Sequence, residues 1–390
     1  MKTFLCVALL FCLSVVPAAA QSQITTGAIQ GTVSDTSGAV VSAATVKVRN
    51  LDTNLEKNLT TDSSGRFVAL LLPPGRYEVT INGKGFGTLV QQNINLTVGQ
   101  TVTLVPQLKV AASTEQVVVT ATPDIDTSKV ESSSTLNERS IEQTPILGRK
   151  FEDFLTLTPG VSITQGPDGD EINFNGQRGI FNNVSLDGGD YNNGFFGEQA
   201  GGQRAAVDIS LEAVKEFQVV ASGASAEFGR SGGGIVNVIT KSGTNDFHGS
   251  IFHYQRLQAL TSNTSDGKPL KDFHREQSGL TLGGPIQKNK QFFFFAFEQI
   301  GANLQRANLS EQTGKVACPV AAPTIQANEA QINANDDCAR LALLGFMRTS
   351  RGQEEGLPVR RPTHNSAVLG KYDLNLNQKN QLSASYSFDA

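Results

Sequence analysis

Histidine and cysteine are scarce in this sequence of 390 residues. The first of its four histidines is His248, and beyond residue 20 the first cysteine is Cys318. A zinc site of nitrogen and sulfur ligands, or a Ser-His or Cys-His catalytic pair, therefore cannot be assembled in the amino-terminal part of the chain. His248 and His253 are five positions apart in the sequence, and on a strand this odd offset places them on opposite faces. We expect no metal site, no cofactor and no enzymatic activity.

Basic stripes and long apolar runs are missing as well. Acidic and basic residues are interspersed and the formal net charge is −4, so the composition excludes a nucleic-acid partner. After the amino terminus no stretch approaches the ~18 apolar residues of a membrane helix. Helical periodicity is sparse, and the chain is rich in Gly, Asn, Ser, Thr and Phe. These features predict a mainly β fold.

The first residues resemble an export signal. Lys2 provides a positive charge, residues 4–16 are apolar, and Ala18 to Ala20 supply an Ala-x-Ala cleavage site. We predict that residues 1–20 are a signal peptide, because the apolar run falls short of the ~20 residues that an uncleaved anchor helix needs. Cys318 and Cys338 then remain in an exported protein, where a disulfide is expected rather than two free thiols.

Residues 24–112 contain short strands separated by turn-forming residues, which predicts a small β-sandwich. The predicted strands cover residues 28–33, 44–50, 66–71, 77–81 and 101–108. Asp35 and Asp62 stand in the turns between them. They are either calcium ligands or turn formers, and turn formation is the commoner role.

The spacing within this zone resembles that of the carboxypeptidase-regulatory-like domain, a transthyretin-like sandwich. The resemblance is carried by Gly31-x-Val33-x-Asp35, Gly38, Ala44-Thr45-Val46, Thr61-Asp62-x-x-Gly65-x-Phe67 and Pro74-Gly75-x-Tyr77-x-Val79. Since no catalytic set can be assembled here, we interpret the zone as a binding or spacing module.

Residues 123–244 predict a second, α+β unit. Two short helical or turn segments, residues 140–151 and 155–161, are each stopped by Pro and Gly. A strand that ends at Asp187-Gly188 follows, and then come segments 209–219 and 226–243. In this order the segments resemble the plug domain of TonB-dependent outer-membrane receptors, and more narrowly of their Oar-like branch. The resemblance implies a plug motif of Arg178, Asp187, Gly188, Glu216, Arg230, Gly233 and Lys241.

Other interpretations of this unit fail on spacing. Residues 231–234 lack the Gly-Lys-Ser/Thr ending of a phosphate loop, and neither 168–170 nor 187–190 continues as a calcium loop. We expect the glycines to allow tight turns and a close approach of the plug to the barrel wall. The charged residues either form ion pairs or make a solvated face. They are Glu212, Lys215, Glu216, Glu227, Arg230 and Lys241.

Residues 113–122 link the two units through a short β-branched run. Such a run pairs its backbone with the free edge of another sheet, and two interpretations fit it. It is either the last strand of the sandwich or a TonB box, the segment that these receptors offer to the energy-transducing protein TonB. The plug-like unit that follows favours the TonB box. Its predicted residues are Glu115, Gln116, Val117, Val118, Val119, Thr120 and Ala121.

Residues 245–390 alternate like the strands of a membrane-spanning β-barrel. The predicted strands cover 247–260, 275–286, 291–304, 365–376 and 381–390. Short turns at 287–290 and 377–380 alternate with long loops at 261–272 and 305–363, and the second of these loops contains both cysteines. Residues 292–297 are either a buried strand or a membrane-facing row with an aromatic girdle, and we favour the membrane. A plugged barrel closes with about 22 strands, so we expect this chain to be a fragment.

The predicted fold class is thus mainly β, with a sandwich, an α+β plug and the first strands of a truncated barrel. The resemblance implies an outer-membrane receptor of a Gram-negative-type bacterium, with its sandwich and TonB box in the periplasm. Its expected partners are TonB, outer-membrane lipid and an unidentified extracellular ligand. A structural or adhesive outer-membrane protein without energised uptake is the alternative.

Overall fold

The structure is a computed structural model. It describes residues 25–110, 117–120, 131–146, 148–149, 151–166, 169–192, 209–226, 228–229, 231–263, 273–306, 350, 359–378 and 380–389. The predicted signal peptide and disulfide therefore lie outside the described residues, as do Glu115, Gln116, Ala121, Glu227 and Arg230. Contacts divide the chain into two compact units. One holds the sandwich, the plug and part of the third sheet, and the other holds Ile251–Gly279 and Glu298–Ser366.

The amino-terminal part is a β-sandwich. One sheet has the order β5-β1-β8, the other has the order β10-β7-β6-β3-β4, and β2 pairs with β9. Their bounds are β1 Gly27–Thr32, β2 Ser34–Asp35, β3 Thr45–Asn50, β4 Glu56–Thr60, β5 Arg66–Leu72, β6 Gly75–Asn82, β7 Leu89–Leu96, β8 Thr101–Leu104, β9 Gln107–Leu108 and β10 Val117–Thr120. Alternate residues of β3 and β6 point inward, and Val46, Val79 and Ile81 are fully buried. The predicted sandwich is confirmed.

The sequence missed β4 and β7. Strand β4 consists of Glu-Lys-Asn-Leu-Thr and β7 has Gln-Gln-Asn at its centre, residues with low β propensity. Both strands form because neighbouring strands supply hydrogen-bond partners for their backbones: β4 pairs with β3, and β7 pairs with β6. Tertiary pairing therefore outweighs local propensity here.

Asp35 and Asp62 have the same structural role at two turns. The Oδ1 of Asp35 accepts hydrogen bonds from the N–H of Ser37 and of Ala39, and the Oδ1 of Asp62 accepts them from Ser64 and Arg66. Hydrogen bonding, first of all from the Ser37 and Ser64 hydroxyls, lowers the pKa of both carboxyl groups. Both aspartates form turns, which agrees with the turn role favoured from the sequence.

The plug is a separate α+β unit. Its main sheet has the order β11-β16-β17-β14-β15, and β12 pairs with β13. The bounds are β11 Ser132–Asn137, α2 Glu138–Gln143, α3 Phe151–Leu155, β12 Val161–Gly166, β13 Gly169–Phe174, β14 Asn183–Leu186, β15 Gly189–Asp190, β16 Val214–Ser222 and β17 Ile235–Thr240. The Asn137 side chain caps α2 by accepting from the N–H of Ser140. Phe154, Phe174 and Phe217 centre its core.

A tight hairpin joins β14 to β15. Leu186 pairs with Gly189, so Asp187 and Gly188 are the two turn residues, and both have positive φ, 48° and 82°. Asp-Gly is a preferred sequence for this type I′ turn because both residues must adopt left-handed conformations. The hairpin therefore places Asp187 at the end of the plug sheet.

Gly233 and Gly234, which lie before β17, pack closely against other residues of the plug. A methyl group at Gly233 would overlap the Asn182 side chain, and one at Gly234 would overlap the ring of Phe174. The expected close approach to the barrel strands occurs instead at Gly243, whose added methyl would overlap the backbone of Phe293 and Gly284. For Gly233 and Gly234, packing inside the plug replaces the predicted contact with the barrel wall.

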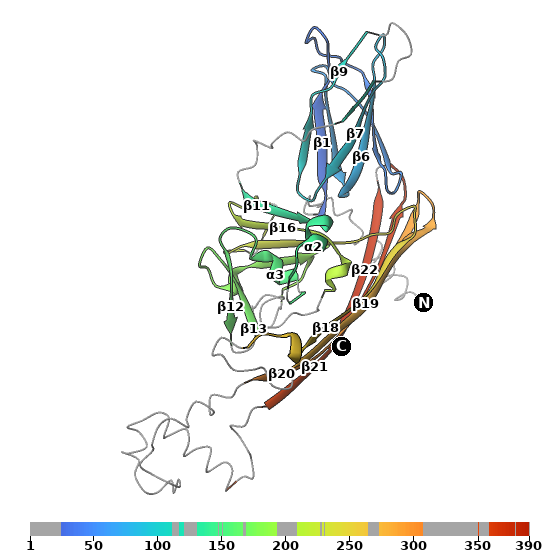
Figure 1. Ribbon diagram of the computed structural model, residues 1–390. Helices are drawn as coiled ribbons and strands as arrows, with labels where there is room; N and C mark the ends of the chain where they lie inside the picture. Colours follow the sequence, from blue (N-terminus) through green and yellow to red (C-terminus); the bar gives the residue numbers. More distant parts are fainter. Residues whose placement is uncertain are drawn as a thin grey trace, which may run out of the picture. The chain divides into compact units, whose positions relative to one another are not determined.

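The third sheet has the order β18-β19-β20-β21-β22 (Figure 1). The bounds are β18 His248–Leu257, β19 His274–Gln287, β20 Gln291–Arg306, β21 Val359–Asn375 and β22 Gln381–Asp389. All five predicted strands and both short turns are present, although β21 begins earlier than predicted. Within the described residues, the third sheet stays open between its edge strands β18 and β22, as expected for part of a barrel. None of the described helices has the length and hydrophobicity of a membrane span.

The phenylalanine run of β20 serves both faces of this sheet. Phe292 and Phe294 are buried, whereas Phe295 is exposed, because successive residues of a strand point to opposite faces. Leu280 and Leu282 of β19 are likewise exposed. Phe292 and Phe294 therefore face inward, and the membrane-facing role stays a prediction for the exposed face.

Replacing Gly234 with Ala should destabilise the plug by about 1–3 kcal/mol, because the added methyl overlaps Phe174 and an overpacked core must shift. Gly229→Ala is the matched control, since nothing lies within 4 Å of its added methyl. Chemical unfolding of the detergent-solubilised chain measures both variants. Equal unfolding midpoints would contradict the packing described for Gly234.

Candidate functional site

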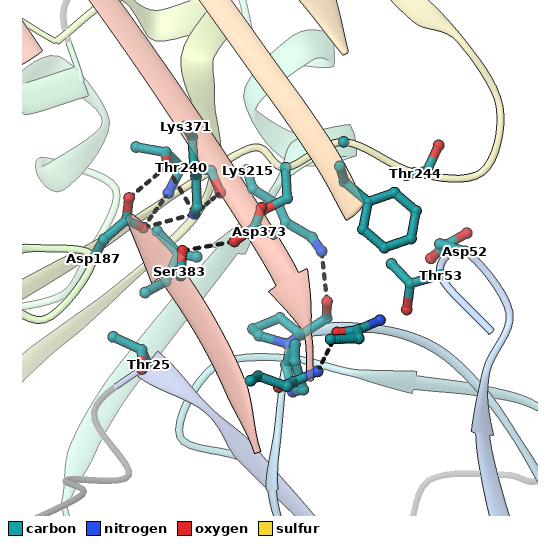
Figure 2. A pocket seen from close by; sticks show the side chains of 18 of the residues that line it. Thr25, Asp52, Thr53, Asp187, Lys215, Thr240, Thr244, Lys371, Asp373 and Ser383 are labelled. Carbon is teal, nitrogen blue, oxygen red and sulfur yellow. Dashed lines mark hydrogen bonds and ion pairs between the residues drawn. The ribbon is translucent and has the colours of Figure 1, made fainter. Parts of the chain in front are cut away.

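Asp187 connects three segments of the chain. Its carboxylate accepts hydrogen bonds from the Thr240 backbone N–H at 2.9 Å and from the Thr240 hydroxyl at 2.5 Å. Lys371 of β21 approaches the same carboxylate at 3.3 Å. Figure 2 shows Asp187 and Lys371 turned toward Thr240. The plug hairpin, the end of β17 and a strand of the third sheet therefore meet at one carboxylate.

The Lys371 ammonium is well supplied with acceptors. Besides Asp187, it donates to the Thr240 hydroxyl at 3.1 Å and to the Thr240 carbonyl at 3.4 Å. The side chains of Lys371 and Asp187 are 7% and 15% exposed. Removing one partner of such a poorly solvated pair leaves the other charge uncompensated, so the pair fixes a specific position of plug against strand.

A small apolar cluster lies between plug and third sheet. Ala213, which directly precedes β16, packs with Phe294, Ala296 and Leu369. Burial of these side chains stabilises the contact between plug and third sheet, in addition to the ion pair. Neither contact is part of a β-ladder, since the plug strands and β18 to β22 belong to different sheets.

Lys215 and Glu216 connect the plug to the sandwich. The Lys215 ammonium donates to the Pro74 carbonyl at 2.5 Å, and the Glu216 carboxylate accepts from the Val98 N–H at 2.6 Å. Burial lowers the pKa of Lys215. Burial also raises the pKa of Glu216 to about 7, an effect that Lys215 and the Val98 N–H oppose. Two neighbouring charges on β16 therefore hold two turns of the sandwich.

A cavity of about 240 Å³ lies beside these contacts (Figure 2). Its lining includes Lys215, Lys371, Asp52, Asp187 and Asp373. Among the described residues no group of three or more His, Cys, Asp and Glu side chains is placed to hold a metal ion. The arrangement pairs charges and fastens the plug to its neighbours.

The predicted charged residues of the plug that the structure describes find partners, some of them unexpected. Glu212 pairs with Arg149 at 2.7 Å, and Lys241 pairs with Glu138 at 2.7 Å. Arg178 directly precedes the short helix η2, Gly179–Phe181. The structure thus brings Asp187 and Gly188 into the site with Glu216 nearby, whereas Arg178, Gly233 and Lys241 lie elsewhere in the plug.

Sequence reasoning missed Lys371 and Thr240. Lys371 lies within a strand that was predicted to cross the membrane, and a lysine there signals an inward-facing charge with a partner. Thr240 is the last residue of β17, and it is fully buried. Only the fold shows that both reach Asp187.

Strand β10 is an edge strand of the sandwich, which is the alternative that the sequence left open for this segment. Val117 to Thr120 pair in parallel with Leu89 to Gln92 of β7, at the edge of the sandwich sheet. Side chains of β10 are not described, and neither are Glu115, Gln116 and Ala121. The pairing leaves the predicted TonB-box role untested.

Three domain families match the chain in order. They are the carboxypeptidase regulatory-like domain over residues 28–109, the TonB-dependent receptor plug domain over 126–236, and an outer membrane beta barrel domain over 239–390. The TonB-dependent transporter Oar of Myxococcus xanthus is 30% identical over 274 residues, which cover 65% of this chain and 25% of the relative. The chain belongs to the TonB-dependent outer-membrane receptors.

A second relative is the probable TonB-dependent siderophore receptor PirA of Acinetobacter baumannii, 26% identical over 170 residues, or 40% of this chain and 21% of the relative. This receptor chain thus spans a quarter or less of the length of these two relatives. Both are a transporter or a receptor rather than an enzyme, which agrees with the expectation of no enzymatic activity. The domain set places the protein in the outer membrane.

Two solved structures are similar to the receptor chain. The siderophore receptor PirA from Pseudomonas aeruginosa has a TM-score of 0.41 and 15% identity, over 67% of this chain and 36% of that one. A mutant of the ferric enterobactin receptor PfeA from the same species has a TM-score of 0.44 and 16% identity, over 66% of this chain and 32% of that one.

Lys371→Met should lower the free energy of unfolding of the plug by about 1–3 kcal/mol, because the buried acceptors at Asp187 and Thr240 lose their donor. Pulse proteolysis in detergent measures the change as faster cleavage within the plug. Lys47→Met is the matched control, since its pair with Glu56 is exposed (41% and 33%) and contributes at most about 1 kcal/mol. Equal protection of both variants would show that Lys371 does not fasten the plug.

The stability of the receptor should depend on pH through Glu216. Its native pKa is about 7 against an ordinary 4.5, so the folded state binds the proton more tightly than the unfolded state does. The stabilisation is complete below pH 4.5 and is lost as the pH rises through 7. At 1.36 kcal/mol per pKa unit the loss is at most on the order of 3 kcal/mol.

Calorimetry at about pH 5 and about pH 8 measures this loss as a fall in melting temperature. Glu216→Gln should remove the fall, since the amide oxygen still accepts from Val98 but does not titrate. Glu142→Gln, at a position 58% exposed, should leave it in place. A wild-type fall that persists in Glu216→Gln would assign it to another group.

Proposed function

We propose that the protein binds a ligand outside the cell and imports it with energy supplied through TonB. The observation that carries this proposal is the way the plug is held. Within the described residues, an ion pair at Asp187 and an apolar cluster around Phe294 join the plug to the third sheet, and no β-ladder joins them. Side-chain contacts of this kind rearrange without unfolding either sheet.

TonB would engage the segment Glu115 to Ala121 by adding it to a sheet edge. That segment lies between the sandwich and the first plug strand, β11, so a pull on it acts on the amino-terminal end of the plug. The sandwich and this segment would lie in the periplasm, and Cys318 and Cys338 would form a disulfide in an outer loop. Domain boundaries at residues 20, 112, 122 and 244 belong to the same proposal.

The ligand belongs to the proposal as well. One matching relative is named a siderophore receptor, which makes ferric siderophores the first class to test. Glycans and peptides are the controls, because the name Oar states no ligand and a fold by itself does not determine one.

Replacing residues 114–121 of the full-length protein with an equally long Gly-Ser linker should abolish uptake and leave surface binding within about twofold, because the linker keeps the length but presents no β-forming strand. Labelled-ligand binding and accumulation in cells measure the two effects. Replacing residues 111–113 with Gly-Ser is the matched control and should change neither. Unchanged uptake in the first variant would reject TonB coupling and favour the structural or adhesive alternative.

A further inference from the structure

Strand β10 occupies the outer edge of the sandwich sheet. Its residues Val117, Val118, Val119 and Thr120 pair in parallel with Leu89, Val90, Gln91 and Gln92. In this order of strands, β10-β7-β6-β3-β4, no strand of the described residues pairs with the other side of β10. The segment proposed to bind TonB is therefore already a strand of this protein's own sheet.

The β10–β7 pairing is short because β7 bends just beyond it. Asn93 has a φ of 60°, and the β6–β7 register shifts between Tyr77 and Val79, which face this part of β7. An irregularity of this kind ends pairing on the strand edge. The pairing of β10 with β7 therefore ends at Thr120 and Gln92, whereas β6 pairs with β7 as far as Leu96.

A pairing of this length and geometry is suited to exchange. Parallel pairing is slightly less stable per residue than antiparallel pairing, and β10 contributes only four residues at a sheet edge. If TonB instead added a strand to the outer edge of β10, its pulling force would act on the four-residue pairing between β10 and β7. Removing β10 would leave the β6–β7 pairing in place.

We propose that the β7 edge of the sandwich holds residues 117–120 in a resting position, and that TonB takes this strand from β7 by strand exchange. This inference rests on the proposed function, because it requires the same residues to be the TonB-binding strand. The sandwich and TonB then compete for one set of backbone donors and acceptors. Access of TonB to the receptor is limited by release of the strand from the sandwich.

A reversible covalent lock tests the exchange. Thr120 and Gln92 are register partners, and neighbouring strands lie about 4.8 Å apart, within the roughly 4.4–6.8 Å Cα separation that a disulfide bridges. Thr120→Cys with Gln92→Cys should therefore form a disulfide. The variants are made in the full chain with Cys318→Ser and Cys338→Ser, so that no native thiol competes.

The probe is the purified periplasmic domain of the host's TonB, added to the receptor in detergent micelles. The oxidised lock should weaken binding at least about tenfold, because the strand cannot leave β7 to pair elsewhere. Reduction should restore the affinity. The control pair Thr120→Cys with Gln91→Cys lies out of register, where side chains alternate between faces, and it should neither cross-link efficiently nor change binding.

Other outcomes separate the inference from the proposed function. Full affinity in the oxidised lock would mean that TonB adds to the outer edge of β10, which overturns exchange but leaves TonB coupling intact. Failure of the register pair to cross-link would overturn the resting position. No binding to any variant, reduced or unmodified, would overturn the proposed function and this inference with it.

Discussion

The hydrogen-bonded ion pair at Asp187 is the interaction on which the arrangement of plug and third sheet depends. A type I′ turn places this carboxylate at the end of the plug sheet, where the Thr240 backbone and hydroxyl hold it. Lys371 then joins the same group from β21. Because both side chains are largely removed from water, the pair has one well-defined geometry, and plug strands and barrel strand are fixed relative to each other without sharing a sheet.

The neighbouring residues Lys215 and Glu216 join the plug to the sandwich. Each binds a backbone group of the sandwich, Pro74 and Val98 respectively. Burial lowers the pKa of Lys215 and raises the pKa of Glu216 to about 7, because both charged forms lose solvation. This contact therefore loses part of its stabilisation as the pH rises through 7. Strand β7 connects this contact to the proposed TonB strand, since it pairs with β10 at one end and leads into Val98 at the other.

Local sequence features predicted much of the fold, and the reasons are specific. Alternation over residues 291–304 and 381–390 predicted strands because a half-buried sheet requires a period of two. Asp35, Asp62 and Asp187 marked turns because their side chains or conformations satisfy turn geometry. Strands β4 and β7 were missed because Glu-Lys-Asn and Gln-Gln-Asn have low β propensity, which the neighbouring strands outweigh.

The sequence by itself determined the order of the domains, the turns and the alternating faces, all of which follow from residues close together in the chain. Tertiary structure decided which charges meet. Lys371 and Asp187 are 184 residues apart, and Glu216 and Val98 are 118 apart, so no local pattern links either pair. Tertiary structure also placed Val117 to Thr120 on β7, since a β-branched strand pairs with whichever edge the fold brings beside it. The physical reason is the same throughout: periodicity fixes which face a residue takes, whereas partners across a fold depend on how whole sheets pack.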